Sequence, residues 1–158
     1  MLSGRLTQTI VRVLDRVMPQ PSLPDSDPQH LQTGRRGEED AYFYLRRRGY
    51  TLIARNYRSP NLRGELDLVG WDKEVLCIIE VKTRTSRAVK PAEAAVDREK
   101  QNELRLMARE FLRHMPGTCQ WRFDVVSVYY DRGFENPAFE LFQNAFSVAY
   151  NRGFSHSR

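Results

Sequence analysis

Hydrophobic and polar residues alternate in several short segments of the chain. Side chains of a strand point to opposite faces in turn, so this alternation is typical of a strand with one buried face. It predicts four strands, over residues 50–57, 64–70, 75–82 and 121–130. Residues 139–146 predict a further short strand at the edge of the sheet.

Other segments carry apolar residues three and four positions apart, the spacing of a helix face. They predict an amphipathic N-terminal helix over residues 2–18 and two further helices over residues 37–48 and 91–115. Asp97 is a candidate N-cap within the last of these. The order α-β-β-β-α-β predicts an α/β fold, with a mixed β-sheet flanked by helices.

The predicted elements divide the chain into three parts. Residues 19–33 read as an exposed linker, because a helix does not accommodate Pro19, Pro21, Pro24 and Pro28. We therefore expect residues 1–33 to form the N-terminal helix and linker, residues 34–147 the main domain, and residues 148–158 a flexible tail.

Two of the predicted strands carry acidic residues among apolar neighbours. Glu65 and Asp67 alternate along the first, while Glu80 and Lys82 alternate along the second. A turn at residues 71–74 is short enough for the two strands to pair, which would bring these charges together. Crowded carboxylates repel one another and lose hydration, so they need a cation, and Mg²⁺ or Mn²⁺ suits oxygen ligands.

The charge of the chain indicates an anionic partner. There are 25 Lys and Arg residues against 20 Asp and Glu residues, and the sequence pI is about 9.5. Residues 34–58 are rich in arginine and contain no lysine, and arginine suits bidentate phosphate contacts. A net charge of +5 is also common in proteins that bind no nucleic acid, so the clustering carries more weight than the total.

Length and composition favour one domain in the cytoplasm. A chain of 158 residues with 41% hydrophobic residues can bury one ordinary core. No apolar run approaches the roughly 20 residues of a membrane span, and the first residues lack the apolar stretch of a signal peptide. The two cysteines are too few and too scattered for a disulfide framework or a zinc site.

The motifs, in this order and at this spacing, resemble the YraN family of bacterial proteins of uncertain function. The likeness extends over residues 34–147 and rests on Gly34-Arg35-Arg36-Gly37-Glu38, Arg55-Asn56-Tyr57-Arg58, Gly64-Glu65-Leu66-Asp67, Glu80-Val81-Lys82-Thr83-Arg84, Val96-Asp97, Lys100-Gln101, Arg122-Phe123-Asp124 and Asn144-Ala145-Phe146. That family is in turn similar to the restriction-endonuclease-like superfamily, and most of all to Holliday-junction resolvases.

This resemblance implies a nuclease site. Asp67 and Glu80 would be metal ligands, Lys82 the catalytic lysine, and Glu38 a further acid from the preceding helix, with Mg²⁺ or Mn²⁺ as cofactor. The chain departs from the superfamily pattern in having Leu66 where a proline precedes the aspartate, a short insertion at residues 59–62, and residues 1–33, which have no counterpart.

Several of these residues have a second interpretation. Lys82 is either the group that orients the attacking water or only the counter-charge of the carboxylates. Glu38 either faces the sheet or merely favours its helix N-terminus. Glu65 either joins the site or pairs with Arg58 or Arg84.

Candidate nucleic-acid contacts surround these acids. They are Arg35, Arg36, Arg58, Arg84, Lys100 and Gln101, with Thr83 beside them. Salt bridges are the competing interpretation for Arg58 and Arg84, and Lys100 and Gln101 face the cleft only if their helix packs across the sheet. Asp124 we expect to satisfy a buried arginine or backbone group rather than a metal.

Two functions follow as expectations. The first is a Mg²⁺-dependent DNA endonuclease with selectivity for branched DNA or junctions; the second is a binding module that keeps the fold and acids without hydrolysis. DNA is the expected partner, and symmetric cutting of a junction would require a homodimer. The helix over residues 2–18 is expected to dock on a second copy or another protein, since its apolar stripe needs cover.

Overall fold

The computed structural model describes residues 29–84, 96–130 and 136–149. The predicted helix over residues 2–18 and most of the predicted tail therefore lie outside the described residues. The described elements are α2 (Gln29–Arg47), β1 (Thr51–Tyr57), β2 (Leu66–Asp72), β3 (Val75–Arg84), α3 (Arg98–Arg113), β4 (Trp121–Tyr129) and β5 (Ala138–Phe146). No helix among the described residues has both the length and the apolar character needed to cross a membrane.

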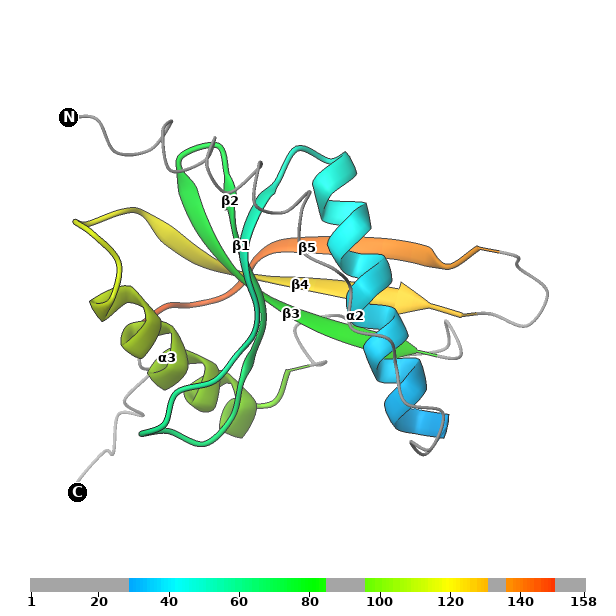
Figure 1. The fold of residues 1–158 in the computed structure, drawn as a ribbon, viewed down its shortest axis with the longest axis horizontal. Coiled ribbons are helices and arrows are strands. Elements are labelled where there is room, and N and C mark those ends of the chain that lie inside the picture. The colour runs from blue at the N-terminus through cyan, green and yellow to red at the C-terminus, as the bar shows by residue number, and fades with distance from the viewer. Residues whose placement is uncertain (1–28, 85–95, 131–135, 150–158) are drawn as a thin grey trace, which may run out of the picture.

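The strands form one sheet in the order β1-β2-β3-β4-β5 (Figure 1). Neighbouring strands are antiparallel except β3 and β4, which are parallel. A parallel pair needs a long crossover connection, and α3 lies within it. The predicted α/β class, with a mixed sheet flanked by helices, is confirmed, and the arrangement is consistent with a restriction-endonuclease-like fold.

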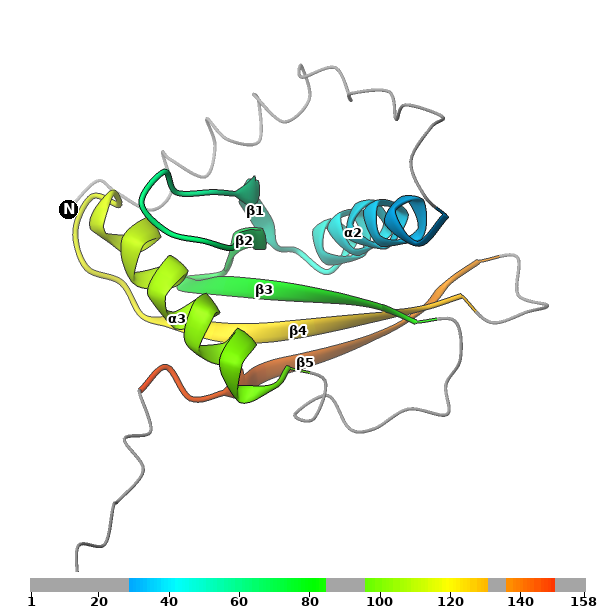
Figure 2. The same ribbon diagram turned by 90° about the horizontal axis from the view of Figure 1, so that it is seen from below.

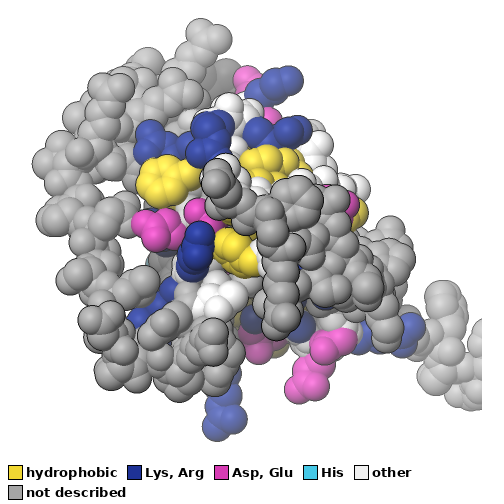
Figure 3. Space-filling view, turned by 90° about the vertical axis from the view of Figure 1, so that its right-hand side faces the viewer, with side chains coloured by type: hydrophobic (Ala, Val, Ile, Leu, Met, Phe, Trp, Pro, Cys, Tyr) yellow, Lys and Arg dark blue, Asp and Glu magenta, His cyan; other side chains and the backbone are white. Residues whose placement is uncertain are grey.

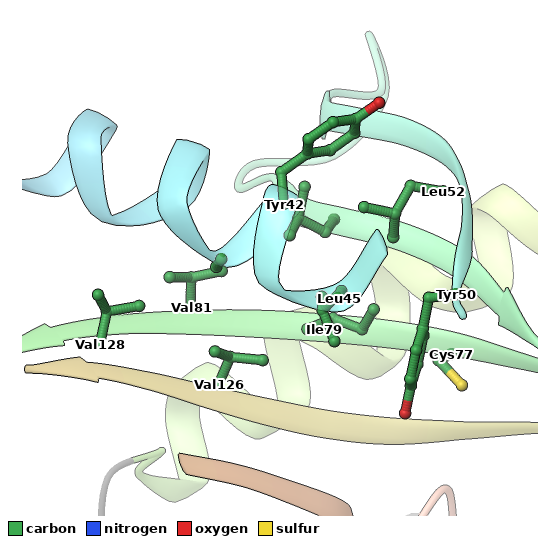
Figure 4. Close-up of a cluster of buried hydrophobic side chains, with 11 residues drawn as sticks. Tyr42, Leu45, Tyr50, Leu52, Cys77, Ile79, Val81, Val126 and Val128 are labelled. Atoms are coloured by element: carbon green, nitrogen blue, oxygen red, sulfur yellow. The ribbon is translucent and has the colours of Figure 1, made fainter. Parts of the chain in front are cut away.

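Each helix covers one face of the sheet with its own hydrophobic cluster. On the α2 side, Ala41, Tyr42 and Leu45 belong to a cluster with residues of the strands, and Figure 4 shows Leu45 directly over Ile79 of β3. On the α3 side, the cluster contains Leu104, Met107, Ala108, Leu66, Ile78, Phe123 and Val125. Figure 2 shows α2 and α3 on different sides of the strands. The central strands are therefore buried on both faces.

Helix α2 begins at Gln29, eight residues before the predicted start at residue 37. The predicted start was too late because it was inferred from the apolar positions that pack on the sheet, and these begin only at Ala41. Proline is absent from residues 29–36, so a helix nucleated by the packed turns can propagate toward the N-terminus. The predicted linker is therefore at least five residues shorter than residues 19–33.

Strand β2 begins at Leu66, two residues later than predicted. Gly64 has φ +100°, and a Cβ there would lie 2.5 Å from the carboxyl carbon of Glu103 on α3. This residue therefore forms a bend under α3 rather than part of the strand. Glu65 also precedes the strand, while Trp71 and Asp72, predicted as turn, belong to it.

Helix α3 is shorter than the predicted segment of residues 91–115. It begins at Arg98, and the Asp97 side chain accepts a hydrogen bond from the Lys100 amide nitrogen at 2.8 Å, so the predicted N-cap is confirmed. Residues 91–95 lie outside the described part of the chain. The predicted edge strand is also confirmed, as β5 beside β4.

Candidate active site

Strands β2 and β3 stop pairing with each other next to Asp67 and Glu80. Pairing of β2 with β3 runs from Asp72 and Val75 to Leu68 and Ile79, whereas pairing of β2 with β1 continues to Leu66. Beyond Ile79, β3 stays paired with β4 as far as Arg84. We call this point, from residues 66–68 on β2 and 79–82 on β3, the strand fork.

Asp67 takes the place of a backbone partner at the strand fork. Its Oδ2 accepts a hydrogen bond from the Val81 amide nitrogen at 2.8 Å, so the amide that loses its β2 partner remains satisfied. Asp67 is only 8% exposed. Burial and repulsion from Glu80 raise its pKa to about 8 from an ordinary 3.8, although the Val81 hydrogen bond acts in the opposite direction.

Glu80 is more deeply buried, at 4% exposure, and only one of its oxygens is well satisfied. Oε1 accepts a hydrogen bond from Lys82 Nζ at 2.8 Å. Oε2 is buried without a hydrogen-bond partner among the described residues, and Lys100 Nζ lies 3.9 Å from it. The structure thus brings Asp67, Glu80 and Lys82 together, as predicted, and adds Lys100 on the side of α3.

Glu38 lies near this pair without joining it. Asn56 Nδ2 donates a hydrogen bond to Glu38 Oε2 at 3.0 Å. Burial and the charges of Glu65 and Glu80 raise the pKa of Glu38, while Arg55 and Arg35 act in the opposite direction. Glu38 is half-buried and lies close enough to Glu80 for that charge to raise its pKa. This agrees with the predicted inward orientation of Glu38. Asn56 had not been singled out from the sequence, although it belongs to the motif at residues 55–58.

The donor set fits a hard divalent cation. In residues 29–84, 96–130 and 136–149, no three His, Cys, Asp or Glu side chains converge as a ready metal cage. Mg²⁺ is commonly bound by one or two carboxylates, with waters and substrate phosphates as further ligands. Asp67 and Glu80, with an unpartnered buried oxygen between charged neighbours, meet that requirement.

The two predicted contacts at the start of α3 differ from each other. Lys100 faces the strand fork and forms an ion pair with Glu103 Oε1 at 2.7 Å. Gln101 is engaged elsewhere: its Nε2 donates to the Val96 carbonyl at 2.9 Å, and its Oε1 accepts from Arg105 at 3.1 Å. Gln101 braces the entry to α3, and its contact with nucleic acid stays a prediction.

Glu65 and Arg58 pair with each other, which answers one of the open alternatives. Arg58 approaches Glu65 Oε2 with Nε at 2.9 Å and a terminal nitrogen at 2.7 Å. The guanidinium remains largely exposed, with 75% of its side chain accessible. Arg58 can therefore still meet a phosphate from its outer edge.

The other basic residues lie along α2 and the end of β3. Arg36 lies 3.8 Å from Asp40 and stacks over the Tyr130 ring at 5.0 Å, and Arg35 acts electrostatically on Glu38. Arg84 ends β3. Figure 3, which views the right-hand side of Figure 1, shows Lys and Arg side chains beside hydrophobic and acidic ones.

Thr83 is a packing residue in this structure. A Cβ on Gly37 of α2 would lie 1.9 Å from Thr83 Oγ1, so only glycine permits the helix and strand to approach this closely. The contact fixes α2 one residue before Glu38. A role of Thr83 toward phosphate stays a prediction.

Asp124 belongs to a separate network, as expected. It is fully buried and accepts hydrogen bonds from Arg122 Nε at 2.8 Å and from the Asn144 amide nitrogen at 2.9 Å. It therefore satisfies an arginine and a backbone group.

These features define a class: an α/β protein with a restriction-endonuclease-like sheet that places two buried carboxylates and a lysine at a strand fork. The chain belongs to the family described as uncharacterised protein family UPF0102, whose model matches residues 37–128. This confirms the YraN resemblance. The matched range includes Glu38, Asp67, Glu80, Lys82 and Lys100.

Relatives from several bacteria share this similarity. The chain is 51% identical over 143 residues to a UPF0102 protein of Koribacter versatilis, covering 90% of this chain and 96% of the relative. It is 45% identical to one of Solibacter usitatus, covering 72% and 84%, and 38% identical to one of Desulforamulus reducens, covering 66% and 86%. The first match leaves 15 of the 158 residues uncovered, so it includes part of residues 1–33, whereas the family model begins only at residue 37.

Proposed function

We propose that this protein is a divalent-cation-dependent DNA endonuclease that hydrolyses phosphodiester bonds. One observation carries the proposal: Asp67 and Glu80 are buried side by side with less compensation than two carboxylates need. Such a pair costs stability, so its presence beside a lysine is typical of a site that binds a cation and acts on an anion.

The chemistry divides among three residues. Asp67 and Glu80 would hold Mg²⁺ or Mn²⁺, and the bound ion supplies a water of lowered pKa and relief of charge on a phosphate oxygen. Lys82, held 2.8 Å from Glu80 Oε1, is placed to orient or deprotonate that water. Glu38 is the further acid, bonded to Asn56 and sensitive to the charge of Glu80.

The basic residues would position the substrate. Arg35, Arg36, Arg58 and Arg84 are the proposed phosphate contacts on α2, on the segment after β1 and at the end of β3. We place the protein in the cytoplasm and propose branched DNA or junctions as substrates, with a homodimer for symmetric cutting. Docking of the helix predicted over residues 2–18 on a second copy or another protein is part of the same proposal.

Cleavage of branched, single-stranded and duplex DNA with Mg²⁺, Mn²⁺ or EDTA tests this function. We expect cutting with either cation and none with EDTA. Asp67→Asn, Glu80→Gln and Lys82→Ala should each lower the rate by about 10²–10⁴-fold, since each removes a ligand or the water-orienting ammonium. Glu74→Gln, on the turn of the same hairpin, is the control and should cut at the parent rate. Parent rates in any of the three site variants would rule out this assignment.

A non-catalytic binding module is the second candidate. Two observations favour it. Lys82 already donates a hydrogen bond to Glu80, as a simple counter-charge would, and no three candidate metal ligands converge among the described residues. A module of this kind would bind the same DNA without producing fragments under any cation. Its affinity for DNA would be the same in the parent and in Lys82→Ala.

A further inference from the structure

Two ammonium groups flank the Glu80 carboxylate from different elements. Lys82, on the same strand, donates to Oε1 at 2.8 Å. Lys100, on α3, lies 3.9 Å from Oε2, which is an electrostatic contact and too long for a hydrogen bond. The unpartnered oxygen of Glu80 therefore faces a cation that is close but not bonded to it.

The backbone of Lys100 is fixed by the helix cap, whereas its side chain lies between two acids. Its amide nitrogen donates to the Asp97 cap at 2.8 Å, which fixes the first turn of α3. Its Nζ forms a hydrogen bond with Glu103 Oε1 at 2.7 Å while facing Glu80. Burial lowers the pKa of Lys100, but the Glu103 hydrogen bond and the charges of Glu80, Glu103 and Asp67 outweigh it, so the group stays charged.

We propose that Lys100 is a displaceable counter-ion of the carboxylate pair. Without a divalent cation, its ammonium offsets the charge of Glu80 and Asp67. When a cation binds these acids, Lys100 stays on Glu103 and its remaining donors become available to a substrate phosphate. The inference rests on the cation site of the proposed function and assigns a positioning role to Lys100, with Glu103 as the residue that retains it.

The proposal predicts opposite effects for the two members of the pair. Removing the Lys100 charge removes a competitor for Glu80, so a divalent cation should bind more tightly. Removing the Glu103 charge leaves Glu80 and Asp67 as the remaining acids that the structure shows acting on Lys100, so the cation should bind less tightly. A residue that only packs α3 against the sheet would not produce this reversal of sign.

Calorimetric titration of the full chain with Mn²⁺, without DNA, measures these affinities. Lys100→Met should lower the Mn²⁺ dissociation constant about tenfold, and Glu103→Gln should raise it about threefold or more. Lys100→Arg keeps the charge and should resemble the parent. The charge-matched controls are Arg109→Met and Glu99→Gln, both exposed on α3.

Arg109 lies nine residues beyond Lys100, about 13 Å along the helix, which exceeds the screening length at physiological salt. Its substitution should therefore change the constant by less than about twofold. An unchanged constant in Lys100→Met, in a parent that binds Mn²⁺, would overturn the counter-ion role and leave the proposed function standing. A parent that binds no divalent cation would remove both.

Coupling between cation and DNA gives a second readout. Fluorescence anisotropy with a labelled branched DNA, with and without Ca²⁺, measures how much the cation tightens DNA binding, with intact DNA verified on a gel. The parent should show tightening of about tenfold and Lys100→Met about twofold, because the cation no longer releases a phosphate contact. Equal tightening in both proteins would contradict the release of Lys100 to the substrate.

Discussion

Two buried groups of charges lie on the same sheet, and they differ in how completely they are satisfied. In one, Arg122 bonds to Asp124 and Asp72, with Tyr50 and Gln143 completing the network. In the other, the strand fork, Asp67 and Glu80 share two lysines, and one carboxylate oxygen has no hydrogen bond among the described residues.

The difference separates a structural network from the proposed cation site. The Arg122 network joins the loop before β1 with β2, β4 and β5, and both oxygens of its fully buried Asp124 are bonded. Networks of this kind hold a fold together when every member is satisfied. The strand fork keeps repelling carboxylates instead, and a protein retains such an arrangement where it serves a reaction or a ligand.

The same substitution at the two aspartates should give opposite results, and this is the largest effect expected on stability. Asp124→Asn should cost about 2–4 kcal/mol, because it removes the fully buried charge partner of Arg122 and leaves Asp72 as its remaining carboxylate. Asp67→Asn should leave the free energy of unfolding unchanged or raise it by up to about 2 kcal/mol, because the neutral amide needs neither the proton that Asp67 takes up on folding nor the burial of a charge beside Glu80. Urea unfolding of both variants at neutral pH in EDTA measures these changes. A comparable loss of unfolding free energy in both would show that the two groups of charges do not differ in this way.

The strand fork should also give the stability of the protein a distinctive pH dependence. The pKa of Asp67 is raised from 3.8 to about 8, so between these values the folded protein holds a proton that the unfolded chain has released. The native state then binds more protons, and stability falls as pH rises through this window, by at most about 1.4 kcal/mol per pH unit for this one group.

Unfolding in EDTA at several pH values between 4 and 8, for the parent and Asp67→Asn, isolates this contribution. The variant should show a flatter dependence, since it lacks the titrating group. Asp124→Asn cannot serve as the comparison if it fails to fold, so Glu74→Gln on the exposed turn is the control and should keep the parent slope. Identical slopes in the parent and Asp67→Asn would show that the repulsion is absent.

A smaller effect concerns how α2 is placed beside the strand fork. Gly37→Ala should cost about 1–2 kcal/mol, because its Cβ would overlap Thr83 Oγ1 and the helix must shift. Gly34→Ala, on the same helix with nothing within 4 Å, should instead stabilise by up to about 1 kcal/mol. Thermal unfolding compares the two.

Thr83→Ala in the Gly37→Ala background should recover most of the loss, because it removes the overlapping oxygen. No recovery would mean that the helix is held by other contacts.

Much of the fold was predictable from local pattern. Alternation predicted β1, β3 and β4 to within about two residues, and helical spacing within residues 91–115 predicted α3, with Asp97 as its candidate cap. These elements depend on neighbours in the sequence, which a periodic pattern records directly. The start of α2 was missed, because propagation of a helix beyond its packed turns leaves no apolar stripe.

The candidate site was predicted only as far as one hairpin extends. Asp67, Glu80 and Lys82 are joined by a short turn, so alternation and pairing were enough to bring them together. Contacts between segments far apart in the chain are harder to predict from the sequence pattern. Examples are Glu38 with Asn56, Lys100 with Glu80, and Gln101 with Arg105. Which of two polar neighbours faces the site depends on the packing of a whole helix.

The sequence by itself determined the class of the sheet, the hairpin that carries the acids and the presence of a lysine beside them, because these follow from side-chain alternation and short connections. Only the tertiary structure decided that β2 leaves β3 at Asp67, that the Asp67 carboxylate then replaces the lost backbone partner, and that α3 brings a second ammonium to Glu80. The physical reason is that pairing ends, burial and charge compensation are set jointly by several elements, and no one segment encodes them.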